Sequence, residues 1–243
     1  MEENWLTEIF NKYLAGPANS VLTMANSPAK DPTHPWATWL VMELLVVAII
    51  VLLVTVLKPR LSADKPGKLQ HLFETLYEFL ITQARDVGVE HPEKYVNWFG
   101  TVFIFILVSN LLGILPFLES PTMTVYVPAA LAVCTWVYYH AMGLKAVGPA
   151  AYLKHFGGPI LALAPLMFFI EIIGHTARML SLTVRLYGNM YAGEQLINVF
   201  IGLTYIIVPA LFMGLHVFVA FLQAYVFTLL TMIYVSMGTS HEH

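Results

Sequence analysis

The stretch YIIVPALFMGLHVFVAFLQAYVFTLLTMIYVSM, residues 205–237, decides the fold class of this chain. It is apolar almost throughout and has no strong helix breaker after Pro209. At a rise of 1.5 Å per residue, an unbroken helix of this length measures about 50 Å, whereas the hydrocarbon core of a bilayer is ~30 Å thick. We therefore expect a membrane helix that tilts steeply or runs partly along the membrane plane.

The composition of the whole chain supports the same class. Hydrophobic residues make up 58% of the 243 residues and charged residues only 11%, whereas a soluble domain is about 25% charged. This length holds five or six membrane helices and leaves no room for a large soluble domain. The net charge of −3 makes nucleic acid an unexpected partner. The single cysteine, Cys134, cannot form an internal disulfide.

The pattern of apolar runs predicts an all-α membrane protein. We expect five membrane-embedded helices, the last two long and strongly tilted, plus one amphipathic helix, within 69–87, on the membrane surface. The predicted segments are a polar extracytoplasmic N-terminal arm (1–35), a first span (36–57), a cytoplasmic segment with the amphipathic helix (58–97), a hairpin of two spans (98–144), a cytoplasmic loop (145–158), a long tilted helix (159–201), and a second long tilted helix with the C-terminus (202–243).

The distribution of Lys and Arg predicts the orientation. The segment 58–97 holds six of them and the loop 145–158 holds two, whereas the turns at 119–124 and 202–204 hold none. The positive-inside rule therefore places the first two segments in the cytoplasm. Five spans then leave the N-terminus outside and the C-terminus in the cytoplasm.

The fourth predicted span carries ionisable residues at membrane depth. They are Glu171, His175, Arg178, Arg185 and Glu194. Each such group costs at least ~2.5–3.5 kcal/mol on insertion scales, so their concentration in one helix needs a reason. Glu171, Arg178 and Arg185 recur every seven residues, about two turns, and therefore share one face of the helix.

Ordinary structural roles remain open for most of these groups. Arg178 could extend to the interface or pair with Glu171. Polar pairs could instead form a patch at a helix end or hydrogen bonds between helices; the candidates are Glu171 with His175, Glu194 with His216, and Asn189 with Gln223.

Arg185 is harder to explain in this way. It lies in the middle of its helix and has no acid on its own face within one turn. A buried arginine without such a partner predicts a carboxylate supplied from elsewhere.

Three segments carry a resemblance to a known family. Residues 182–194, LTVRLYGNMYAGE, resemble the most characteristic stretch of subunit a of bacterial-type F-type ATP synthases. Residues 216–228, HVFVAFLQAYVFT, resemble its H-x₆-Q-A-[FY]-[IV]-F pattern, and 109–116, SNLLGILP, resemble its N-L-[ILM]-x-[LI]-[LI]-P turn. With the predicted layout, the resemblance covers nearly the whole chain from about residue 36.

The resemblance implies a function and a set of site residues. The chain would be the stationary ion-channel subunit of a rotary ATP synthase, with two offset proton half-channels separated by Arg185. Glu194, Asn189, His216 and Gln223 would match the outer half-channel, and Glu171 with His175 the cytoplasmic one. Some family members carry an acid where this chain has Gly113, so the outer relay would depend on Glu194, His216 and water.

The resemblance also implies the partners. These are a c-subunit ring, peripheral-stalk b subunits, the ATP synthase holoenzyme, the lipid bilayer of the cell (inner) membrane, and protons or sodium ions. No cofactor is expected. We expect no catalytic residue and no metal, because the chain has no HExxH or GxSxG motif and His175 and His216 lack a convincing third ligand. The rival classes are an autonomous secondary transporter, an intramembrane enzyme and a structural anchor.

Overall fold

The structure is a computed structural model that describes residues 4–24, 31–62, 66–115, 118–148, 164–203 and 207–239. These residues form α-helices and short 3₁₀ turns, with no strand among them. The α-helices are α1 (Trp5–Met24), α2 (Thr38–Leu57), α3 (Lys68–Asp86), α4 (Val96–Leu112), α5 (Tyr126–Val147), α7 (Ala164–Leu203) and α8 (Ile207–Thr239), and the 3₁₀ turns are η1 (Lys58–Arg60), η2 (Pro92–Lys94) and η3 (Pro121–Met123).

The all-helical class is confirmed, together with several helices that suit a membrane. Among the described residues, α2, α5, α7 and α8 are each long and apolar enough to cross a bilayer, and α4 is a shorter apolar helix. α7 has 40 residues and α8 has 33. Straight helices of these lengths measure roughly 60 and 50 Å, well beyond the ~30 Å of a hydrocarbon core.

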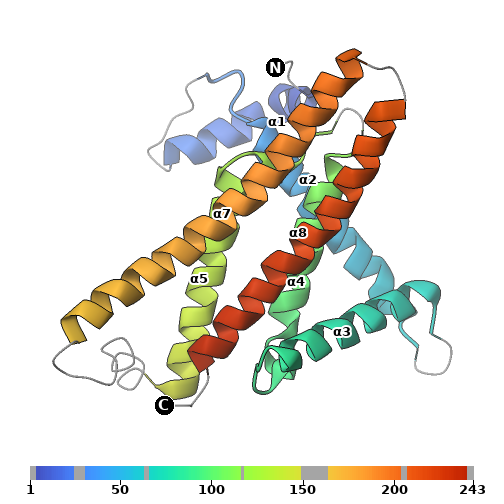
Figure 1. Ribbon diagram of the computed structural model, residues 1–243. Helices are drawn as coiled ribbons and strands as arrows, with labels where there is room; N and C mark the ends of the chain where they lie inside the picture. The colour runs from blue at the N-terminus through green and yellow to red at the C-terminus, as the bar shows by residue number, and fades with distance from the viewer. Residues whose placement is uncertain are drawn as a thin grey trace.

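The core joins α4, α5, α7 and α8. α4 packs against α8, and α5 packs against both α7 and α8. The core includes large side chains that are almost inaccessible to solvent: Phe99, Ile106, Leu186, Met190, Phe227 and Met232. Figure 1 shows α7 and α8 converging at the end where α7 finishes and α8 begins, and diverging towards the other end, where α5 packs against both.

The helix α3 covers the range 69–87 to within one residue, and its role as an amphipathic surface helix stays a prediction. It lies across one end of the bundle and packs against α4 and α8 (Figure 1). The Tyr225 hydroxyl on α8 donates a 2.6 Å hydrogen bond to Oε1 of Gln83 on α3. Leu69 and Leu72 on α3 remain exposed, and the position of α3 on a membrane surface stays a prediction.

The N-terminal arm is more regular than the sequence suggested, because residues 5–24 form the helix α1. Asn11 contacts the backbone of Trp36 at both ends: its Oδ1 accepts from the Trp36 N–H at 2.9 Å, and its Nδ2 donates to the carbonyl at 3.4 Å. The rings of Phe10 and Trp36 also meet edge to face. Contacts with the start of α2 therefore stabilise α1 despite Pro17 within it.

Parts of all the predicted segments except the first span (36–57) lie outside the described residues. Residues 149–163 include most of the loop 145–158 and the first residues of the segment 159–201. The C-terminal residues 240–243 also lie outside.

Candidate functional site

Arg185 lies on an exposed face of α7. Leu182 and Leu186, on either side of it in sequence, are buried in the core and fix the rotation of the helix. Their packing turns the Arg185 side chain outward. Among the residues that the structure describes, Arg185 makes no hydrogen bond and no ion pair. The cation therefore lies at the surface, and no acid among the described residues neutralises it.

Arg178 has a different environment, although it shares that face of α7. Its guanidinium lies over the ring of Tyr234 on α8, 5.5 Å from the ring centroid. This distance is within the range of a cation–π interaction. The described residues contain no ion pair between Arg178 and Glu171, so the pairing considered from the sequence is not observed.

Glu171 and His175 are in contact near the start of α7. Nε2 of His175 lies 3.1 Å from Oε1 of Glu171. The other ring nitrogen, Nδ1, lies 2.6 Å from the hydroxyl of Tyr139 on α5. The His140 ring, also on α5, lies with its centroid 4.7 Å from that of His175. Sequence spacing found the pair on α7 but missed the two residues on α5.

Asn189 and Gln223 join α7 to α8. Nδ2 of Asn189 donates to Oε1 of Gln223 at 2.8 Å. The Nε2 of Gln223 is buried, and no hydrogen-bond partner for it occurs within the described ranges. A buried donor in this state costs about 1–3 kcal/mol unless water or a partner meets it.

Glu194 and His216 lie one turn further along α7 and on the facing part of α8. Glu194 is partly buried, and Asn198, one turn further along α7, and Glu119 lie in its neighbourhood. His216 is buried and packs against Gly193, where an added Cβ would lie only 2.5 Å from its Nδ1. His216 is thus held against Gly193, the residue that precedes Glu194, although no direct bond between His216 and Glu194 occurs in the described part of the chain.

Close packing explains why position 113 is a glycine. A Cβ at this position would lie 2.7 Å from the Cβ of Ser120 and 3.1 Å from its backbone nitrogen. Ser120 donates or accepts within a buried group at this end of α4, where Thr122 donates to Oδ1 of Asn110 at 2.7 Å. An acid in place of Gly113 would displace this packing.

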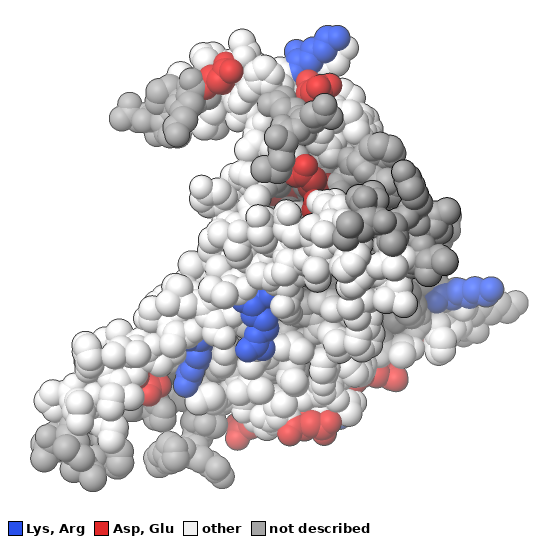
Figure 2. All heavy atoms as spheres, turned by 45° about the horizontal axis from the view of Figure 1, so that its top comes forward, with Lys and Arg blue, Asp and Glu red and all other residues white. Residues whose placement is uncertain are grey.

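Four charged residues follow one another along the axis of α7: Glu171, Arg178, Arg185 and Glu194. Arg185 lies between Glu171 and Glu194, at roughly 21 and 14 Å along the helix. Figure 2 shows a mostly uncharged surface in which scattered basic and acidic groups stand out. The site therefore has two polar groups, one towards each end of α7, with an exposed cation between them.

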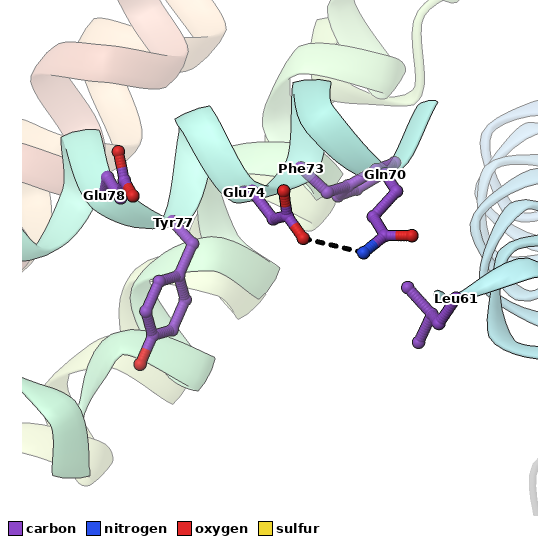
Figure 3. A pocket seen from close by; sticks show the side chains of 6 residues that line it. All are labelled: Leu61, Gln70, Phe73, Glu74, Tyr77 and Glu78. Carbon is purple, nitrogen blue, oxygen red and sulfur yellow. Dashed lines mark hydrogen bonds between the residues drawn. The ribbon is translucent and has the colours of Figure 1, made fainter. Parts of the chain in front are cut away.

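A surface hollow lies elsewhere, on α3 (Figure 3). Its lining includes Gln70 and Glu74, whose side chains are hydrogen-bonded at 2.8 Å, together with Leu61, Phe73, Tyr77 and Glu78. It is separate from the polar groups of α7. Within the described ranges, no group of three or more His, Cys, Asp or Glu side chains could hold a metal ion.

Long apolar helices, one of which, α7, carries charges in its middle, define a polytopic membrane protein. Comparison with known proteins specifies the family. The family model for the ATP synthase A chain matches residues 40–236. The chain is 52% identical to ATP synthase subunit a of Solibacter usitatus over 235 residues, 97% of this chain and 100% of that protein.

Other relatives agree. Identity is 40% to ATP synthase subunit a of Koribacter versatilis, covering 98% of both chains. It is 41% to ATP synthase subunit a of Geotalea daltonii, covering 85% of this chain and 87% of that one. The chain belongs to the ATP synthase subunit a family, the non-catalytic, proton-translocating membrane subunit of F-type ATP synthases.

Proposed function

We propose that this chain is the stationary ion-channel subunit of a rotary ATP synthase and that Arg185 separates two offset proton half-channels. The observation that carries the proposal is the exposed Arg185 guanidinium, which has no acidic partner among the described residues. A carboxylate presented by a rotating c-ring would supply that partner. The proposal includes five embedded helices with α4 among them, α3 on the cytoplasmic surface, the N-terminus outside and the C-terminus in the cytoplasm.

The outer half-channel consists of Glu194, His216, Asn189 and Gln223. Glu and His can exchange protons near neutral pH, whereas Asn and Gln can hold water. The buried Nε2 of Gln223 supports a water position, since it has no protein partner within the described residues. Glu171 and His175 form the cytoplasmic half-channel at the other end of α7.

Arginine suits the position between the half-channels. Its guanidinium stays protonated in proteins, so it cannot relay a proton itself. It stabilises an ionised ring carboxylate, which favours proton release towards one side, and it interrupts a continuous path between the two sides. The ring carboxyl then takes a proton from the other half-channel and enters the lipid as a neutral acid.

The proposed partners are the c-ring, the peripheral-stalk b subunits and the rest of the holoenzyme in the inner cell membrane. Protons are the expected ion. The exposed apolar residues around Arg185, including Leu180 and Val184, form a surface that the rotating ring contacts.

The test is the substitution Arg185→Lys in the reconstituted holoenzyme, with ATP-driven proton pumping as the readout. An ammonium can lose its proton and lacks the planar fork of arginine, so pumping should be abolished. Arg178→Lys is the matched control, because it keeps a cation over the Tyr234 ring and should retain most of the pumping. Normal pumping by Arg185→Lys would refute the proposal.

A further inference from the structure

The contact between α5 and α7 near Glu171 contains a continuous chain of hydrogen-bonding groups. Tyr139 Oη lies 2.6 Å from Nδ1 of His175, and Nε2 of His175 lies 3.1 Å from Oε1 of Glu171. The Tyr139 and His175 rings are nearly parallel, with centroids 5.6 Å apart. Each contact joins atoms that can donate or accept a proton. Tyr139 therefore extends the α7 pair onto a second helix.

The three side chains of this hydrogen-bonding path differ in burial. Tyr139 is 2% exposed, whereas the side chain of His175 is 11% exposed and that of Glu171 is 36% exposed. The path from Tyr139 through His175 to Glu171 thus leads from the core of the bundle to its surface. At its inner end, the Tyr139 ring meets Tyr234, the residue beneath the Arg178 guanidinium.

Both contacts of His175 are compatible with either charge state of the histidine. Neutral His175 has two tautomers: one accepts from the Tyr139 hydroxyl at Nδ1 and donates from Nε2–H to the Glu171 carboxylate, and the other donates from Nδ1–H to the tyrosine oxygen and accepts at Nε2 from a protonated Glu171. With His175 protonated, both ring nitrogens donate, and the tyrosine oxygen accepts in place of donating. A group that keeps its neighbours in both states can take up and release a proton without rearranging the helices.

We propose that Tyr139 is a proton-relay residue of the cytoplasmic half-channel, which exchanges protons with Glu171 through His175. This inference rests on the proposed function. In the direction of ATP-driven pumping, and starting from the tautomer of His175 that carries its proton on Nδ1, the Glu171 O–H bond breaks as an Nε2–H bond forms. The Nδ1–H bond then breaks as a proton passes to the Tyr139 oxygen, whose own proton leaves inward to water on the ring side. Glu171 regains a proton from cytoplasmic water, and His175 recovers its first tautomer by exchange with water, so one proton is transferred.

The surroundings contain further titratable groups. On α5, His140 has its ring 4.7 Å from His175 and 4.4 Å from Tyr139. On α7, Arg178 lies close to the cluster, and on α8 Tyr234 lies 5.9 Å from Tyr139 between ring centroids. A pH dependence of transport must therefore be assigned by comparing variants rather than from one profile.

The test uses Tyr139→Phe, which removes the hydroxyl and keeps the ring. Tyr138→Phe is the matched control, because Tyr138 stacks on Trp98 with centroids 4.4 Å apart and takes no part in the chain. Each variant is reconstituted as the holoenzyme in proteoliposomes, and ATP-driven pumping is measured while the pH on the ATP side and the lumenal pH are varied separately. Copurification of the complex and its ATPase activity verify assembly.

We expect Tyr139→Phe to slow pumping by about tenfold at neutral pH, a modest effect for loss of one proton-transfer group because water can replace part of it. The deficit should grow as the ATP-side pH rises and shrink as it falls, since hydronium then replaces the relay. Lumenal pH should not change it. Adding His175→Gln should cause no further loss, since both substitutions interrupt one path.

Two results would overturn the inference. One is a wild-type rate and pH profile for Tyr139→Phe. The other is a deficit of equal size at every pH on both sides, which would indicate a packing role alone. Failure of this inference is distinguishable from failure of the proposed function, because Arg185→Lys would still abolish pumping in the first case and would pump normally in the second.

Discussion

Gly193→Ala should impair transport by moving His216. The added Cβ would lie 2.5 Å from Nδ1 and 2.7 Å from Cε1 of the imidazole, whereas ordinary contacts are 3.4–4 Å. The ring must therefore withdraw by roughly 1 Å, or α7 and α8 must separate at this point. Because His216 is 7% exposed, it has little free space to enter.

The magnitude follows from the size of that displacement. Overpacking of this kind costs about 1–3 kcal/mol, which a membrane complex of this size should tolerate. A displacement of about 1 Å in a positioned group can slow a reaction by up to ~10²-fold. We therefore expect an assembled complex whose proton pumping falls by roughly ten- to a hundredfold.

The assay is ATP-driven pumping by the reconstituted holoenzyme, normalised to the amount of assembled complex. Gly214→Ala is the matched control, since a Cβ there meets nothing within 4 Å in this chain. The double variant Gly193→Ala/His216→Ala should pump no worse than His216→Ala alone, because the clash is then removed. Wild-type pumping by Gly193→Ala, or fully multiplicative losses in the double variant, would refute the reasoning.

Two further substitutions test the contacts between helices. Gln223→Leu removes the acceptor of the hydrogen bond from Asn189. The loss of one net hydrogen bond, about 0.5–1.5 kcal/mol, should slow proton pumping by roughly two- to tenfold. The complex should still assemble, and pumping is measured in proteoliposomes. Unchanged pumping would remove this pair from the path. Tyr225→Phe removes the 2.6 Å hydrogen bond to Gln83 that connects α8 to α3. This substitution should lower the free energy of unfolding by about 0.5–1.5 kcal/mol, measured as a lower transition temperature of the solubilised complex. Proton pumping at low temperature should be unchanged. An unaltered transition would show that this bond is not needed to hold α3.

The sequence predicted most of the helical layout because hydrophobic run length and charge content determine which segments suit a bilayer. The last two helices are as long as expected, since few residues in 164–203 or 207–239 interrupt them. The helix α1 was not predicted, because Pro17 and the polar composition disguised it. Its stability depends on Trp36, which lies beyond it in sequence.

The contacts of the candidate site were predictable within one helix and, between helices, for one pair: the sequence offered Asn189 with Gln223, and Nδ2 of Asn189 donates to Oε1 of Gln223 at 2.8 Å. Spacing along α7 predicted that Glu171 and His175 lie near the same face, and the two side chains are in contact, with His175 Nε2 3.1 Å from Glu171 Oε1. It could not pair His175 with Tyr139, which is 36 residues away on α5. That contact depends on how two helices are rotated against each other, and the packing of both helices against α8 contributes to it.

The glycine at position 113 illustrates a similar limit. The sequence shows only that an acid is missing at Gly113. The structure supplies a cause, because Ser120 occupies the space that a side chain would need. Tight packing between a helix end and a returning turn leaves no periodic signal in the sequence.

The most direct measurement is a structure of the assembled membrane sector, in which the distance from the Arg185 guanidinium to the nearest ring carboxylate can be read. We expect one carboxylate within about 4–6 Å, a range in which opposite charges stabilise each other. A ring that packs against another face of the chain, with Arg185 turned to lipid or bound to an acid of its own chain, would contradict the account.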